Sequence, residues 1–175
     1  MGTTPTRLMT VEEFDRIPNP PGGVYELYHG ELVKMGYPKP AHTRGQLQIR
    51  RLFEMAAGNA GVIKEEMPFR ALPQYECWAA DIAFVSRNRW DNMGDDWLMG
   101  APELVVEILS PSNSLPRLMD KARICLENGS REFWIVSLRR RTITVLTQHG
   151  ETIYGPGGRV PLFFDGEIAV DDIFE

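Results

Sequence analysis

A glutamate stands inside an apolar stretch of the chain, where a charged group is unfavourable. Residues 104–109 are apolar except for Glu107, a pattern that is typical of a strand buried on both faces. A carboxylate in such a strand loses much of its hydration. We therefore expect a metal ion, a cation or several hydrogen-bond donors beside Glu107.

Asp81 interrupts a second apolar, strand-like run at residues 78–86. Two inner strands that each carry one carboxylate can hold a divalent cation between them, since magnesium takes only one or two carboxylates and keeps several waters. Asp81 and Glu107 are therefore candidate ligands for Mg²⁺ or Mn²⁺. Two other interpretations stay open: a strand-end cap at Asp81, and a buried salt bridge between Glu107 and Lys121.

The segment after Glu107 is expected to place Lys121 on a helix. The sequence SPSNSLP at residues 110–116 is rich in turn and cap residues, and the helical stretch ends before Gly129, a favourable residue just past a helix. Residues 132–137 form another apolar run. A strand, a helix and a second strand in succession predict a right-handed crossover with parallel pairing.

The other segments complete the prediction of one mixed α/β domain of 175 residues. TVEE at residues 10–13 is a capping box for a short helix. Strands are expected at 24–28, 31–35, 61–70 and 142–148 and in the C-terminal tail, and a helix at 42–58. Residues 88–100 are expected to form a long loop in which Trp90 and Trp97 contact a substrate or partner.

The net charge of −5 argues against a protein that binds nucleic acid broadly and unspecifically, because most such proteins are basic. A local basic groove can still coexist with an acidic remainder. Arg44 and Arg51 share one face of the expected helix, and Arg139, Arg140 and Arg141 lie at a turn. These five residues are candidate phosphate contacts. A solvated face and a solvated turn are the alternatives.

Cys77 and Cys125 stand far apart without a CxxC spacing, so reduced, buried thiols are expected rather than a zinc site or a disulfide. No apolar run approaches the length of a membrane span, and the N-terminus lacks a signal-peptide core. We expect a cytoplasmic protein with no membrane partner and no small organic cofactor.

The order of these motifs resembles the Uma-two family of endonucleases, a branch of the restriction-endonuclease-like PD-(D/E)XK superfamily. The matching segments are Asp81, ELVVEILSPS around Glu107, DKARICLENG with Lys121, EFWIV, and YELYHGELVKM near the N-terminus. The resemblance covers almost the whole chain. It implies a mixed central sheet flanked by helices and a metal-dependent endonuclease that cleaves DNA as a homodimer.

The resemblance also implies roles for single residues. Lys121 matches a catalytic lysine that has moved into the helix from the strand position of Leu109. Two nearby carboxylates raise the pKa of a lysine, so Lys121 is expected to orient water and stabilise charge rather than act as a base. Glu26 and His42 are additional candidates, for which a solvent-facing strand residue and an exposed helix-end histidine are the alternatives.

Departures from the family pattern near Lys121, such as Cys125 in place of a tyrosine, leave two rival hypotheses. One is a catalytically weak or inactive relative that serves as a nucleic-acid-binding or dimerisation module. The other is a structural protein in which Glu107 and Lys121 form a core ion pair.

Overall fold

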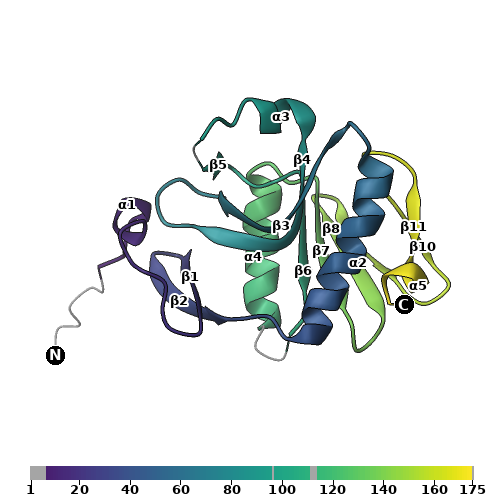
Figure 1. The fold of residues 1–175 in the computed structure, drawn as a ribbon, viewed down its shortest axis with the longest axis horizontal. Coiled ribbons are helices and arrows are strands. Elements are labelled where there is room, and N and C mark those ends of the chain that lie inside the picture. Colours follow the sequence, from purple (N-terminus) through teal and green to yellow (C-terminus); the bar gives the residue numbers. More distant parts are fainter. Residues whose placement is uncertain (1–6, 96, 111–113, 175) are drawn as a thin grey trace.

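The computed structural model describes residues 7–95, 97–110 and 114–174. Its centre is a seven-stranded mixed sheet in the order β5-β3-β4-β6-β7-β8-β9 (Figure 1). The predicted SPSNSLP turn lies partly outside the described residues. The strands are β3 Gly61–Arg70, β4 Trp78–Ser86, β5 Leu98–Met99, β6 Leu104–Ile108, β7 Glu132–Ser137, β8 Thr142–Thr147 and β9 Gly150–Tyr154.

Strand β6 lies in the middle of the sheet and is buried at every position, as its apolar sequence predicts. It pairs antiparallel with β4 and parallel with β7, with Leu104 opposite Glu132 and Ile108 opposite Val136. Helix α4, Leu115–Glu127, connects β6 to β7. The predicted parallel pairing across a helical connection is therefore confirmed.

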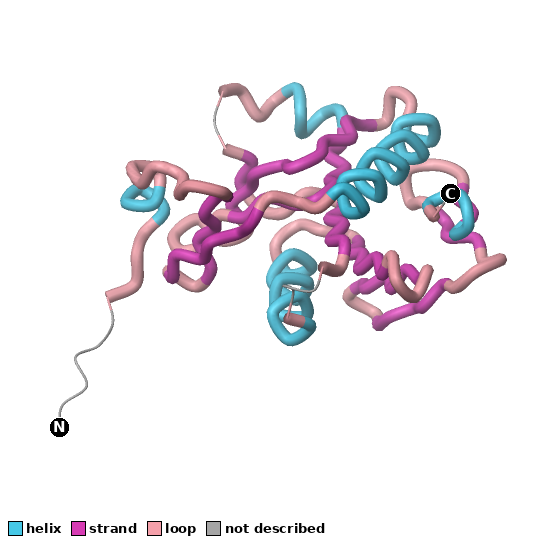
Figure 2. The backbone as a smooth tube through the Cα atoms, turned by 60° about the horizontal axis from the view of Figure 1, so that its bottom comes forward, coloured by secondary structure: helices cyan, strands magenta, loops and turns pink. Residues whose placement is uncertain are grey.

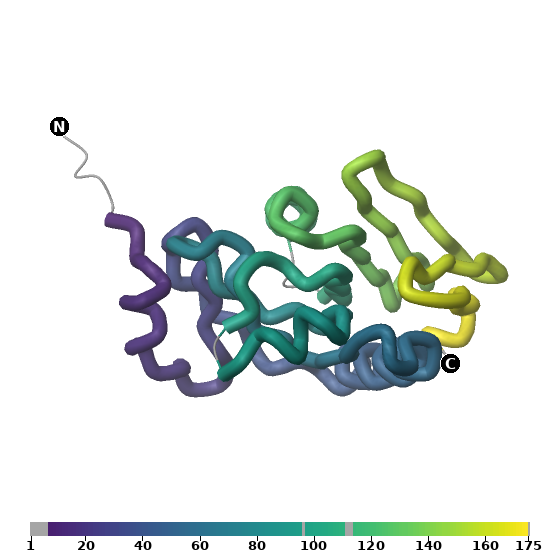
Figure 3. Tube along the Cα trace, turned by 90° about the horizontal axis from the view of Figure 1, so that it is seen from above, coloured from purple at the N-terminus to yellow at the C-terminus, as the bar shows by residue number. Residues whose placement is uncertain are grey.

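Helices α2 (Pro40–Ala57) and α4 cover opposite faces of the sheet (Figures 2 and 3). Phe53 of α2 packs in one apolar cluster with Val106, whereas Leu118 of α4 packs in another with Val105. Neighbouring residues of β6 thus enter different cores, because side chains alternate along a strand. Each large apolar side chain buried in this way contributes about 1.5–3 kcal/mol.

Two small units flank the central sheet at opposite ends of the molecule (Figure 1). The hairpin of β1 (Gly23–Tyr28) and β2 (Glu31–Gly36) follows α1, Val11–Phe14, which begins with the predicted capping box. At the other end, β10 (Arg159–Pro161) pairs with β11 (Glu167–Ala169), followed by α5, Val170–Ile173. The predicted N-terminal hairpin and the predicted C-terminal strand pair are both confirmed.

Residues 88–100 do not form the irregular loop that the sequence predicts. They contain most of α3, Arg87–Asp91, and the short strand β5, which pairs parallel with β3. Trp90 and Trp97 are half-buried. Strand β9 was not predicted, because its residues are exposed or half-exposed at the sheet edge and lack an apolar alternation. None of the described helices is long and apolar enough to cross a membrane.

Candidate active site

The ladder between β3 and β4 is interrupted at one position, where the register skips Glu66 and Asp81. Glu66 has a φ of 48°, in the left-handed region that non-glycine residues seldom adopt. Ala80 packs in the α4-side cluster, whereas Ile82 packs in the α2-side cluster. The interruption therefore changes the face to which β4 side chains point, and Asp81 lies at the point of change.

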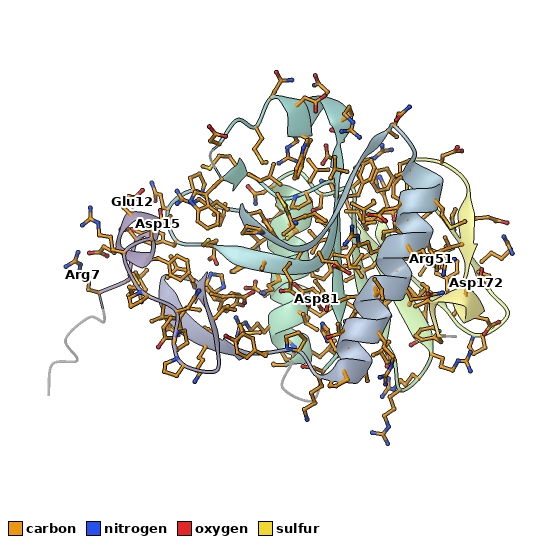
Figure 4. All side chains as sticks on the ribbon, viewed as in Figure 1. Arg7, Glu12, Asp15, Arg51, Asp81 and Asp172 are labelled. Carbon is orange, nitrogen blue, oxygen red and sulfur yellow. The ribbon has the colours of Figure 1, made fainter. Side chains whose placement is uncertain are left out.

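Asp81 and Glu107 lie where β4 and β6 separate. The ladder ends with Ile82 paired to Val106, so the next position would bring Asp81 opposite Glu107. Instead, Asp81 Oδ2 accepts a hydrogen bond at 2.7 Å from the backbone N–H of Ile108. Figure 4 shows Asp81 in the middle of the molecule, beside α2. Adjacent strands thus supply one carboxylate each at this fork.

Glu107 and Lys121 are both almost fully buried, with 7% and 4% of their surface exposed. Lys121 Nζ lies 3.8 Å from Glu107 Oε1. Burial raises the pKa of Glu107 well above its usual range, and Asp81 adds to the rise although Lys121 opposes it. The described protein groups therefore compensate the negative charge of Glu107 only in part.

Glu26 of β1 faces this site rather than solvent, with only 5% of its surface exposed. Its Oε2 accepts a hydrogen bond from Lys121 Nζ at 2.9 Å and another from Arg117 Nη2 at 3.1 Å. Its Oε1 accepts a hydrogen bond from the backbone N–H of Ala79 at 3.3 Å. The nearest carboxylate to Lys121 is therefore Glu26, and a simple Glu107–Lys121 ion pair does not describe the core.

The surroundings of Lys121 favour its protonated form. Burial alone would lower the pKa of Lys121, but Glu107 and Glu26 outweigh this effect and leave the pKa above its ordinary value. The ammonium also lies 5.2 Å from the centre of the Trp78 ring, a favourable cation–π distance. A residue in this state can donate hydrogen bonds and stabilise negative charge, but it is poorly suited to accept a proton.

Helix α2 adds polar groups on the other side of Asp81. His42 Nε2 lies 3.1 Å from Asp81 Oδ1, and the His42 side chain is only 14% exposed, so it is not an exposed helix-end residue. Burial lowers the pKa of His42, but Asp81 and Glu66 raise it by more. One turn later, Gln46 Nε2 donates to the Asp81 carbonyl oxygen at 3.2 Å and to the Glu66 carboxylate.

The model of the Uma2 family, described as "Putative restriction endonuclease", matches residues 11–163. The chain belongs to the Uma2 family. This membership confirms the predicted resemblance and assigns the chain to nucleases of the restriction-endonuclease type.

A crystal structure from Anabaena variabilis ATCC 29413, described as "a putative nuclease belonging to DUF820", has the same fold as this Uma2 chain. The TM-score is 0.83 at 19% sequence identity, over 95% of this chain and 97% of that chain. The likeness confirms the predicted mixed sheet flanked by helices. No curated protein matches the sequence.

Two of the basic segments predicted to contact phosphate lie close together in this Uma2 protein. Arg44 and Arg139 are exposed. Their neighbours in the sequence, Gly45 and Leu138, pack closely together, because a Cβ atom on Gly45 would lie 3.1 Å from the Leu138 side chain. The same Gly45 position adjoins Ile108, whose backbone N–H binds Asp81. The segments that carry Arg44 and Arg139 therefore meet beside Ile108.

The remaining predicted basic residues differ in their surroundings. Arg140 is exposed in the same turn as Arg139. Arg141 is directed toward the C-terminal unit, where it lies 3.6 Å from Asp171. Arg51 lies on the far side of α2 from Asp81, beside Asp172 (Figure 4). The structure thus does not bring Arg51 and Arg141 to the site.

Sequence reasoning missed Gln46 and Glu66, and it considered Arg117 only as a replacement for Lys121. Gln46 and Arg117 each stand four residues from a predicted site residue on the same helix, His42 and Lys121, so helical spacing offered a signal for both. Glu66 offered none, because its position depends on a local backbone conformation that the residue type does not favour.

The described residues contain no group of three or more His, Cys, Asp or Glu side chains that could hold a metal ion. A magnesium-type site does not require such a group, since one or two carboxylates and several waters are sufficient. The incompletely compensated charge of Glu107 beside Asp81 fits a divalent cation of this kind.

Proposed function

We propose that this protein hydrolyses phosphodiester bonds in DNA with Mg²⁺ or Mn²⁺ held by Asp81 and Glu107. The observation that carries the proposal is the placement of these two acids at the fork of β4 and β6, with the Lys121 ammonium beside them. Carboxylate oxygens are ligands that hard divalent cations such as Mg²⁺ prefer. A bound cation supplies a water of lowered pKa and neutralises charge on the phosphate.

The residues of the chain orient the reacting groups. Asp81 is fixed on one side by the Ile108 N–H and on the other by His42, so its carboxylate has little freedom to turn. Lys121 is held by Glu26 and has its charge close to Glu107. In this position the ammonium can orient a water and stabilise the negative charge that grows on the phosphate in the transition state.

The exposed residues Arg44, Arg139 and Arg140 are proposed to contact phosphates of the DNA outside the reacting group. Similar nucleases cut the two strands with two copies of one site related by a two-fold axis. We therefore propose a homodimer, which light scattering at tens of micromolar would reveal as a doubled mass. Action in the cytoplasm stays a prediction.

Cleavage of supercoiled plasmid DNA by the purified protein with Mn²⁺ tests the proposal. The wild type should convert the plasmid to nicked and linear forms, and EDTA should stop the reaction. Glu107→Gln keeps the shape of the side chain and removes its charge, so it should not cleave. Cleavage by this variant at the wild-type rate would exclude Glu107 as a ligand. Binding of DNA without any turnover would favour the inactive binding module instead.

A further inference from the structure

Arg117 lies one helical turn before Lys121 on α4, and the two residues share a partner. Arg117 Nη2 donates to Glu26 Oε2 at 3.1 Å, and Lys121 Nζ donates to the same oxygen at 2.9 Å. A single carboxylate oxygen therefore receives two cations. Lys121 also lies within ion-pair distance of Glu107. Among the described residues, Glu26 is the only carboxylate within ion-pair distance of Arg117.

The described partners of Arg117 do not use all of its hydrogen-bond donors. Its Nε is buried and has no hydrogen-bond partner among the described residues. Buried donors are nearly always satisfied in the functional state, by protein, by water or by a ligand. The side chain as a whole is nevertheless 24% exposed, so Arg117 lies at the boundary between the buried site and solvent.

The orientation of Arg117 is fixed by an aromatic face. Its guanidinium carbon lies 4.7 Å from the centre of the Tyr28 ring. The Tyr28 hydroxyl in turn donates to Asp120 Oδ2 at 2.6 Å, which ties the ring to α4. Stacking leaves the edges of a guanidinium free for a planar, two-point contact, the geometry with which arginine binds phosphate oxygens.

Another arginine of α4 has a different environment. Arg123 donates to Asp120 and to Glu127, both at 2.9 Å, and its side chain is 56% exposed. Two surface carboxylates neutralise this one cation, and neither of them belongs to the acid pair of the site. Arg123 therefore provides a control with the same charge on the same helix.

We propose that Arg117 binds a phosphate of the nucleic-acid strand next to the phosphate that is cleaved. Residues four apart on a helix are separated by about 6 Å along the axis, which is close to the spacing of successive phosphates in one strand. Lys121 then serves the reacting phosphate and Arg117 the adjacent one, with Glu26 as the anion that both cations hold before the substrate enters. The inference rests on the proposed nuclease function.

The test measures binding of a duplex oligonucleotide with Ca²⁺ over a range of salt concentrations, and cleavage with Mn²⁺. Arg117→Gln should raise Kd and KM by about tenfold and reduce the slope of log K against log salt by about 0.9, the value for one phosphate contact. kcat should change by less than about threefold, because Lys121 is retained. Arg123→Gln should leave the slope and KM unchanged.

Two further measurements keep the failure of this inference separate from that of the proposed function. Arg117→Lys should regain the salt slope, since it restores the charge, and melting curves check that all variants are folded. An Arg117→Gln variant with the wild-type slope and KM would overturn the inference while cleavage by the wild type upholds the nuclease. DNA binding without cleavage, but with a reduced slope in Arg117→Gln, would overturn the nuclease function and leave Arg117 as a phosphate contact only. No binding by the wild type would overturn both.

Discussion

Lys121 Nζ lies 2.9 Å from Glu26 Oε2 and 3.8 Å from Glu107 Oε1. One ammonium thus links a strand of the N-terminal hairpin to the central strand of the main sheet. The contact is buried, so the effective dielectric is lower than in water and charge on Lys121 acts strongly on anything bound near Glu107.

Lys121→Met keeps most of the apolar stem and removes the charge. We expect kcat to fall by roughly 100-fold or more, while the free energy of unfolding falls by less than about 3 kcal/mol. The loss of stability is limited because Glu26 retains Arg117 as an ion-pair partner. Glu107 can in addition take up a proton, which removes its uncompensated charge. Kinetics and urea denaturation check the two numbers, with Lys64→Met, an exposed lysine on β3, as control. A Lys121→Met variant that cleaves at the wild-type rate would exclude a catalytic role.

Addition of Mg²⁺ or Mn²⁺ should raise the melting temperature of the wild type. A ligand that binds only the native state stabilises it by about 2.7 kcal/mol at a concentration of 100 times Kd. The Asp81→Asn, Glu107→Gln double variant should lose this shift, whereas Asp91→Asn on the surface should retain it. A shift that persists in the double variant would place the metal at another site.

Without metal, Glu107→Gln should be as stable as the wild type or more stable by about 1–3 kcal/mol. Burial makes the Glu107 carboxylate unfavourable, and the amide needs no neutralising partner, while Lys121 retains Glu26. Urea denaturation in EDTA at neutral pH measures the difference. A large loss of stability in Glu107→Gln would mean that Glu107 is a structural partner of Lys121.

Asp120 connects α4 to the hairpin that carries Glu26, through Tyr28 and through His29 Nε2 at 2.6 Å. Partial burial opposes the effect, but hydrogen bonds from Tyr28, Arg123 and His29 lower the pKa of Asp120 to about 2. A lowered pKa means that the stability contributed by the carboxylate is complete above its unfolded pKa, near 3.8, and is lost as the pH falls through about 2.

Asp120→Asn should therefore lower the free energy of unfolding at pH 7 by about 1 kcal/mol, a value reduced for solvent screening. The difference from the wild type should shrink as the pH falls from about 4 toward about 2. Urea titrations at several pH values follow this difference. A gap that stays constant across the acid range would show that lost packing, and not the charge, explains the change.

The sequence predicted those parts of the fold that depend on continuous patterns. Strand β6 was predicted from its run of apolar residues, and the single polar residue in that run identified Glu107 as a candidate. Asp81 was predicted from the same kind of signal. The placement of Glu26 beside Lys121 was beyond a single-sequence pattern, because it depends on how the hairpin docks against α4. Strand β9 was missed because an edge strand buries too little to require alternation.

The partners in the candidate site come from distant parts of the chain: Glu26 and Lys121 are 95 positions apart, and Asp81 and Ile108 are 27 apart. During synthesis, the strand that carries Asp81 emerges from the ribosome well before the helix that carries the ammonium. A nascent or prematurely terminated chain that ends before α4 contains Glu26, Asp81 and Glu107 but lacks Lys121 and Arg117. We therefore expect such an interrupted chain to lack both cations that Glu26 binds in the complete chain.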